Sequence, residues 1–183
     1  MTHEAMRARL IALLREKSYR RRRVVLASGR ESDFYVDGKQ TTLHAEGAWL
    51  VGNLVHAALL PEVRAVGGMV IGADPIAAAT AAVSWSLGRP VNAFLVRKEA
   101  KGHGTQRFVE GRENVPDGTP VCMVEDTCTT GGSLLQAVDR AEAEGLRVVQ
   151  CLTIVDREEG AAEAVAARGL VLTSLVRRHE LER

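Results

Sequence analysis

The sequence lacks the long apolar runs that membranes require. None of its apolar stretches approaches the roughly 20 residues of a membrane-spanning helix, and the charged N-terminal stretch MTHEAMRARLIALLREK has no continuous apolar segment like that of a secretory signal. A strong charge of one sign is also missing, because 24 Lys and Arg residues oppose 23 Asp and Glu residues and leave a net charge of +1. We therefore expect no membrane partner and no general affinity for nucleic acid.

Cysteine is scarce, and only Cys122, Cys128 and Cys151 are present. An odd number at this spacing matches neither a disulfide framework nor a zinc site, so we expect no metal held by the protein itself. Cys122 and Cys151 lie in apolar runs and are expected to be buried thiols. Cys128 lies in a polar stretch, but no nearby histidine would activate it. This usage favours a reducing cytoplasm.

What is present is an ordinary globular composition, with 183 residues, 46% of them hydrophobic and 26% charged, which predicts one domain over 1–183. Apolar runs alternate with amphipathic stretches, which is typical of a parallel sheet covered on both faces, with ligands at the carboxyl ends of its strands. Strands are expected at 24–26, 34–36, 65–71, 91–96, 121–125, 148–156 and 170–176, helices at 2–17 (N-cap Thr2), 45–60, 75–87, 132–145 and 159–169, and a long loop at 98–118.

The stretch VCMVEDTCTTGGS (121–133) joins an apolar strand to a helix through acids, hydroxyls and glycines. Glycine allows a tight turn with exposed N–H groups, and a helix N-terminus favours an anion, usually phosphate. The preceding acids, Glu125 and Asp126, repel phosphate and should instead face a sugar diol or a magnesium ion. The stretch could thus hold a ribose 5-phosphate. The alternative is a capped helix start with incidental acids.

This stretch resembles the phosphoribosyl diphosphate signature of type I phosphoribosyltransferases. The resemblance implies that the acids bind the ribose hydroxyls and that 129–133 grips the 5-phosphate. The residues implied in binding phosphoribosyl diphosphate are Arg97, Lys98, Lys101, His103, Glu125, Asp126, Thr127, Cys128, Thr129, Thr130, Gly131, Gly132 and Ser133.

A second stretch, RKEAKGHG (97–104), resembles the mobile catalytic loop of the orotate phosphoribosyltransferases. Its cationic groups could neutralise a departing diphosphate. The resemblance implies that Lys101 and His103 are catalytic together with Asp126, and that the 98–112 loop is shared across a homodimer. A solvated basic loop is the alternative.

A third stretch, ASGRESDFYVDGK (27–39), resembles the hood that covers the base in the orotate enzymes. Tyr35 could stack on a planar pyrimidine. Family members often carry a lysine where this chain has Ala27. The role of that lysine would be absent here or taken over by Arg30 or Lys39, and the sequence does not decide between these two residues.

The base-binding set implied by the resemblance is Tyr35, Thr129 and Arg157. In VDRE (155–158), the planar guanidinium of Arg157 suits the orotate carboxylate, and a surface ion pair with a neighbouring acid is the alternative. GADPIAAA (72–79) occupies the place of the diphosphate loop, where Asp74 would need an intervening cation or would point away.

The fold expected from the resemblance is a type I phosphoribosyltransferase-like α/β parallel sheet flanked by helices, with residues 1–40 forming a small N-terminal hood. The implied reaction joins orotate to the phosphoribosyl group of phosphoribosyl diphosphate, with Mg²⁺ bound mainly through that substrate. A transferase for another base and a non-catalytic nucleotide sensor remain alternatives. The arginines at 20–23 are expected to form a solvated face, since no interleaved aromatics support an RNA patch.

Overall fold

A computed structural model describes the chain except for residues 22–23, 26–30, 33, 100–107 and 183. Its elements are, in chain order, α1 (His3–Lys17), β1 (Tyr19–Arg20), β2 (Val24–Val25), β3 (Glu31–Ser32), β4 (Tyr35–Val36), α2 (Lys39–Thr42), α3 (Ala45–Ala58), β5 (Ala65–Met69), α4 (Asp74–Ser86), β6 (Asn92–Val96), β7 (Val109–Glu110), the 3₁₀ turn η1 (Arg112–Asn114), β8 (Pro120–Cys128), α5 (Gly132–Ala143), β9 (Arg147–Asp156), α6 (Ala161–Ala166), β10 (Leu172–Arg177) and α7 (Arg178–Leu181).

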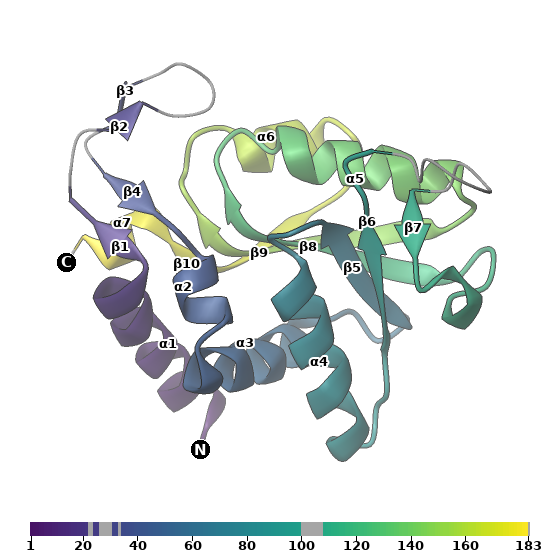
Figure 1. The fold of residues 1–183 in the computed structure, drawn as a ribbon, viewed down its shortest axis with the longest axis horizontal. Coiled ribbons are helices and arrows are strands. Elements are labelled where there is room, and N and C mark those ends of the chain that lie inside the picture. The colour runs from purple at the N-terminus through teal and green to yellow at the C-terminus, as the bar shows by residue number, and fades with distance from the viewer. Residues whose placement is uncertain (22–23, 26–30, 33, 100–107, 183) are drawn as a thin grey trace.

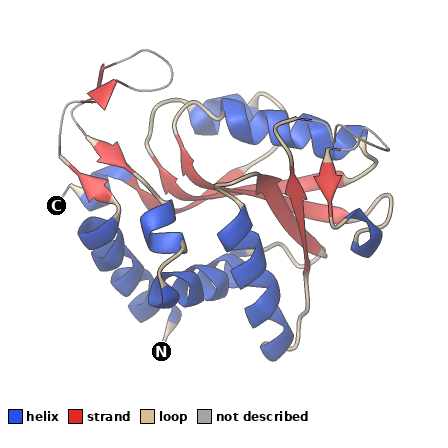
Figure 2. Ribbon diagram, in the orientation of Figure 1, coloured by secondary structure: helices blue, strands red, loops and turns tan. Residues whose placement is uncertain are grey.

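The centre of the molecule is a six-stranded sheet in the order β10-β9-β8-β5-β6-β7. Neighbouring strands are parallel except for β7, which pairs antiparallel with β6. Helices α1 to α4 cover one face, and α5 and α6 cover the other (Figures 1 and 2). The expected sheet with helices on both faces is therefore confirmed, with one antiparallel edge strand added.

Each face of the sheet has its own apolar core. Val124 and Leu152 point into the cluster with α1, α3 and α4, whereas Met123 and Cys151, the residues before them in β8 and β9, point into the cluster with α5 and α6. Successive side chains of a strand face opposite sides. A strand buried on both faces must therefore be apolar throughout, which explains the continuous runs in the sequence.

Local signals fix several helix ends. The Thr2 hydroxyl accepts a hydrogen bond from the N–H of Ala5 at 3.2 Å, which confirms the expected N-cap of α1. Pro75 occupies the first turn of α4, where its missing N–H has no partner to lose. Gly145, with φ of 84°, ends α5 in the left-handed conformation.

Three predictions from the sequence differ most from the structure in extent. The helix expected at 159–169 is α6 and spans only Ala161–Ala166. The strand at 121–125 runs on to Cys128, because the backbone of Glu125–Cys128 stays paired with β9 even though its side chains are polar. The loop at 98–118 contains β7 and η1 within the part that the structure describes. The short elements β1, β3, α2 and α7 were not predicted, because they have too few residues for a periodic pattern. No helix in the described ranges is long and apolar enough to cross a membrane.

Candidate active site

The polar residues singled out from the sequence come from three strand ends at one edge of the sheet. Glu125 and Asp126 lie near the carboxyl end of β8. The Gly72 segment follows β5, and Arg157 follows β9. Because β5, β8 and β9 are adjacent and parallel, their carboxyl ends meet at this edge. This is where ligands bind in open α/β sheets.

The two acids are almost completely buried. Glu125 is 8% exposed and Asp126 is 6% exposed. Burial, reinforced by the neighbouring Asp126 charge, raises the pKa of Glu125 to about 8. Asp126 accepts a hydrogen bond from the Thr127 N–H at 3.0 Å, whereas Oε2 of Glu125 is buried without a hydrogen-bond partner among the described residues. This oxygen is thus available to a hydrogen-bond donor or a cation.

Two glycines let the backbone approach these carboxylates. A Cβ atom added to Gly72 would lie 2.5 Å from Oε1 of Glu125, and one added to Gly38 would lie 2.8 Å from Oδ2 of Asp126. Both distances are shorter than real Cβ contacts. A side chain at either position would push the acids out of place, because the backbone comes this close to them.

Lys39 is the cation that the structure brings to the acid pair. Its Nζ lies 3.5 Å from Oδ2 of Asp126 and 3.0 Å from Oδ1 of Asp37. Burial alone would lower the pKa of Lys39, but the charges of Asp126 and Asp37 outweigh it and raise the pKa. The sequence left Arg30 and Lys39 open as replacements for the lysine expected at position 27. Lys39 reaches the site, and Ala27 and Arg30 lie outside the described residues.

The turn after β8 has the form of an anion site. Gly131 adopts the left-handed conformation with φ of 81° and is the N-cap of α5, and Thr130, Gly132 and Ser133 are exposed. The first N–H groups of α5 have no partners within the helix and carry its positive dipole.

Thr127 and Cys128 precede this turn as the last two residues of β8. The Cys128 side chain is buried in the core, and burial raises the pKa of its thiol well above the ordinary value. All three cysteines are free and buried, which confirms the expectation for Cys122 and Cys151. Oγ1 of Thr127 is buried with no hydrogen-bond partner in the described part of the chain.

An aromatic and cationic cluster joins the N-terminal residues to α7 and to the end of β9. Arg157 is only 4% exposed, and its guanidinium lies 2.9 Å from Oε1 of Glu159 and 4.3 Å from the centre of the Phe34 ring. Arg178 of α7 lies 3.9 Å from the same ring centre, and Tyr19 stacks on it with centroids 6.2 Å apart. Arg157 thus forms an ion pair with a neighbouring acid, but a buried one.

Sequence reasoning missed Phe34 and Arg178, since a contact between the hood and the C-terminal helix leaves no local pattern. Tyr35, next to Phe34, is half-buried on β4 beside β1. Whether Tyr35 or Arg157 contacts a base stays a prediction.

The diphosphate side of the site is described only in part. Arg97 pairs with Glu110 at 2.7 Å, and Lys98 is exposed. Lys101 and His103 lie outside the described residues. Asp74 begins α4, where an acid interacts favourably with the helix dipole. Its Oδ1 atom has no hydrogen-bond partner in the described ranges, and burial raises its pKa.

The sheet, the buried acid pair and the glycine-rich turn define the chain as a type I phosphoribosyltransferase. No family model matches the sequence, but individual relatives do. The orotate phosphoribosyltransferase of Sorangium cellulosum is 49% identical over 176 residues, which are 95% of this chain and 92% of the relative. The chain belongs to the orotate phosphoribosyltransferase family.

Solved structures agree with this assignment. The Mycobacterium tuberculosis H37Rv orotate phosphoribosyltransferase in complex with Fe(III) dicitrate has a TM-score of 0.83 and 44% identity, covering 97% of this chain and 99% of that one. The same enzyme in complex with 5-phospho-α-D-ribosyl 1-diphosphate has a TM-score of 0.78 and 40% identity at the same coverage.

Proposed function

We propose that this chain transfers the 5-phosphoribosyl group from phosphoribosyl diphosphate to orotate, giving orotidine 5-phosphate and diphosphate in pyrimidine biosynthesis. The observation that carries this function is the buried pair Glu125 and Asp126 directly before the glycine-rich start of α5. A ring nitrogen of orotate forms the bond to C1 of the ribose and releases its proton. The bond from C1 to the diphosphate oxygen breaks, and its electron pair leaves with the diphosphate.

The acids hold the ribose and stabilise positive charge on it. Oε2 of Glu125, which is buried without a partner among the described residues, is suited to a ribose hydroxyl. Asp126 and Lys39 fix each other at 3.5 Å, so the second carboxylate is already oriented before substrate binds. The exposed residues Thr130, Gly132 and Ser133 grip the 5-phosphate with hydroxyl and backbone N–H donors.

Magnesium is proposed to enter mainly with phosphoribosyl diphosphate. The donor set fits it, because carboxylate oxygens are magnesium ligands and Oε2 of Glu125 has no competing partner in the part of the chain described. Glu125 and Asp126 would hold it together with the ribose hydroxyls. When bound, it neutralises charge on the diphosphate.

On the base side, Arg157 is proposed to bind the orotate carboxylate, with Tyr35 and Thr129 completing the base site. The ion pair with Glu159 and the contact with Phe34 hold the Arg157 guanidinium in one orientation before substrate arrives. A planar fork held in this way favours a planar carboxylate partner.

On the leaving-group side, Lys101 and His103 are proposed to stabilise the departing diphosphate or to supply a proton to an oxygen of orotate or diphosphate. They would act from the neighbouring subunit of a homodimer, and the enzyme would work in the cytoplasm. Large apolar side chains that one copy leaves exposed favour such a dimer: Trp49 on α3 is 47% exposed, Ile71 66% and Trp85 on α4 79%. Residues 109–110 pair with β6 of the same chain, so the shared part of the 98–112 loop is confined to 98–107.

The reaction is tested by mixing the protein with orotate, phosphoribosyl diphosphate and Mg²⁺, and following the ultraviolet absorbance of orotate together with diphosphate release. We expect the two to change in equal amounts. Binding of phosphoribosyl diphosphate without loss of orotate would contradict the choice of base. Consumption of a purine base would then indicate a transferase for a different base. Absence of turnover with every base would indicate a nucleotide sensor.

Sharing of the loop is tested by mixing Lys101→Ala subunits with Asp126→Asn subunits after reversible dissociation. If Lys101 acts across the dimer, each mixed dimer keeps one intact site. Equal mixing should then restore about a quarter of wild-type turnover, since half of the dimers are mixed and one site in two is intact. No recovery would contradict a shared site.

A further inference from the structure

The last turns of α5 hold both ends of the segment that carries Lys101 and His103. On the N-terminal side, Nη1 of Arg140 donates a hydrogen bond to the carbonyl of Arg97 at 2.6 Å. On the C-terminal side, the guanidinium of Arg140 lies 4.5 Å from the centre of the Phe108 ring. One arginine therefore contacts the residues on both sides of the segment.

Glu144 holds the C-terminal end by its backbone. One carboxylate oxygen, Oε1, accepts hydrogen bonds from the N–H groups of Phe108 and Val109 at 2.5 and 3.0 Å. The two ends are also joined to each other, because the Arg97 N–H donates to the Phe108 carbonyl at 2.8 Å. The residues that flank the segment, Arg97 and Phe108, are thus held against each other and against α5.

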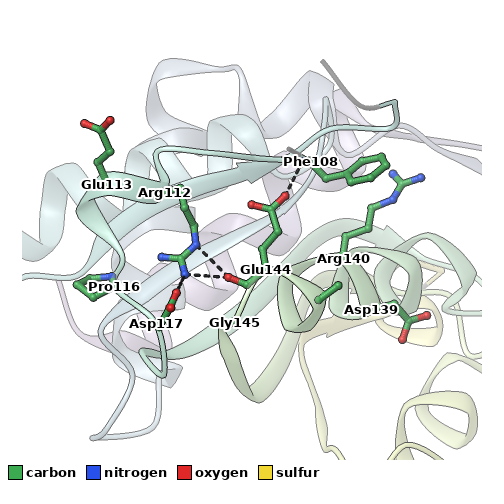
Figure 3. A pocket seen from close by; sticks show the side chains of 10 residues that line it. Phe108, Arg112, Glu113, Pro116, Asp117, Asp139, Arg140, Glu144 and Gly145 are labelled. Carbon is green, nitrogen blue, oxygen red and sulfur yellow. Dashed lines mark hydrogen bonds and ion pairs between the residues drawn. The ribbon is translucent and has the colours of Figure 1, made fainter. Parts of the chain in front are cut away.

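Close packing does not by itself hold these residues in place. A cavity of about 880 Å³ lies beside these contacts, lined by Phe108, Arg112, Arg140, Glu144 and their neighbours (Figure 3). Arg112 forms a further polar contact there, donating from Nη2 to the Glu144 carbonyl at 2.8 Å. Where side chains leave such a space, directed hydrogen bonds carry more of the positioning than packing does.

The same helix starts at the glycine-rich turn of residues 129–133, where the 5-phosphate is proposed to bind and which is called the phosphate turn below. Helix α5 runs from Gly132 to Ala143, and its buried face, which includes Leu134 and Val138, packs against the sheet. A 12-residue helix is a rigid element of about 18 Å. Its N-terminus lies where the 5-phosphate is proposed to bind, and its C-terminal turn holds the segment that is proposed to act on the diphosphate.

We propose that Arg140 and Glu144 are positioning residues for catalysis, which set the ends of the 98–107 segment at a fixed distance from the phosphate turn through α5. This inference rests on the proposed role of Lys101 and His103. Neither positioning residue needs to touch substrate. Their loss should slow the chemical step and leave substrate binding at the phosphate turn intact.

The test compares Glu144→Ala with Glu144→Gln and with Glu142→Ala. Glutamine keeps a carbonyl oxygen that can accept the two N–H groups. Glu142 is a matched control, since it lies two residues away on the same helix turn and pairs with Arg168 at the surface. Turnover, both KM values, calorimetric binding of phosphoribosyl diphosphate and thermal unfolding are measured for each, and Lys101→Ala is measured beside them.

We expect kcat of Glu144→Ala to fall by about ten- to a hundredfold, as a small misplacement of a catalytic group does, and calorimetric affinity for phosphoribosyl diphosphate to fall far less, because the contacts at the turn before α5 remain. Glu144→Gln should recover most of the turnover, and Glu142→Ala should match the wild type. Arg140→Met, which removes the hydrogen bond to Arg97 but keeps an apolar side chain against Phe108, should show the same loss of kcat.

Three results would overturn the proposal. In the first, Glu144→Ala keeps wild-type kcat although Lys101→Ala has lost it, which removes the positioning role but leaves the proposed function standing. In the second, kcat falls, KM rises and thermal stability drops together in both Glu144→Ala and Arg140→Met, which marks the contacts as merely structural. In the third, Lys101→Ala itself keeps full turnover, and the proposed role of the segment fails together with this inference.

Discussion

The protonation of Glu125 gives the sharpest test of how the site is built. Its pKa is raised from the ordinary value of 4.5 to about 8, first by burial and then by the charge of Asp126. The native state therefore binds a proton between these pH values that the unfolded chain has released. The free energy of unfolding must then fall as pH rises through this range, by up to about 1.4 kcal/mol per pH unit.

Replacing Glu125 by glutamine removes this proton and hence the pH dependence that it causes. The rise of the pKa from 4.5 to about 8 corresponds to several kcal/mol, at about 1.4 kcal/mol per pH unit. We expect Glu125→Gln and the wild type to have similar stability near pH 5. The variant should become more stable than the wild type by several kcal/mol near pH 9, because the wild type must then bury a second negative charge beside Asp126.

The assay is urea unfolding of the protein without ligands at each pH unit from 5 to 9. The quantity that matters is the difference between variant and wild type, because the other titrating groups cancel from it. Glu142→Gln, at an exposed carboxylate on α5, is the control and should follow the wild type at every pH. Parallel curves for Glu125→Gln and the wild type would refute the reasoning, since Glu125 would then be ionised in the folded protein as readily as in water.

Three further substitutions test the contacts around the site. Gly72→Ala places a methyl group 2.5 Å from Oε1 of Glu125, so KM for phosphoribosyl diphosphate should rise by about tenfold or more, and a KM within twofold of the wild type would contradict the close approach. Lys39→Ala removes the ammonium 3.5 Å from Asp126 and should weaken calorimetric binding of phosphoribosyl diphosphate, with partial recovery in Lys39→Arg; equal affinity in all three proteins would exclude Lys39 from the site. Arg89→Ala removes a hydrogen bond of 2.7 Å to the carbonyl of His56 at the end of α3, and urea unfolding should show a loss of about 1–2 kcal/mol at unchanged kcat, whereas a fall in kcat would mean that this helix end matters to the site.

Much of the sheet could be predicted because its strands are buried on both faces. A strand such as β9 has apolar side chains on both sides, so it appears in the sequence as a nearly continuous run of apolar residues. The length of β8 could not be read in this way. Its last residues, Glu125 to Cys128, stay in the ladder through backbone hydrogen bonds, which any side chain permits.

The same reasoning separates the parts of the site that the sequence does and does not reveal. The phosphate turn is local: a strand end, glycines, hydroxyls and a helix start follow one another within 125–133, and each is needed where it stands. Lys39 meets Asp126 across 87 positions of the chain, and Glu144 meets Phe108 across 36. In the sequence each is one charged residue among many, and only the packing of α2 against α3 and of α5 against the sheet gives it a partner. A pattern within one segment therefore predicted which substrate group is to be held, whereas the residues proposed to orient the acids and to position the 98–107 segment emerge only from contacts between segments.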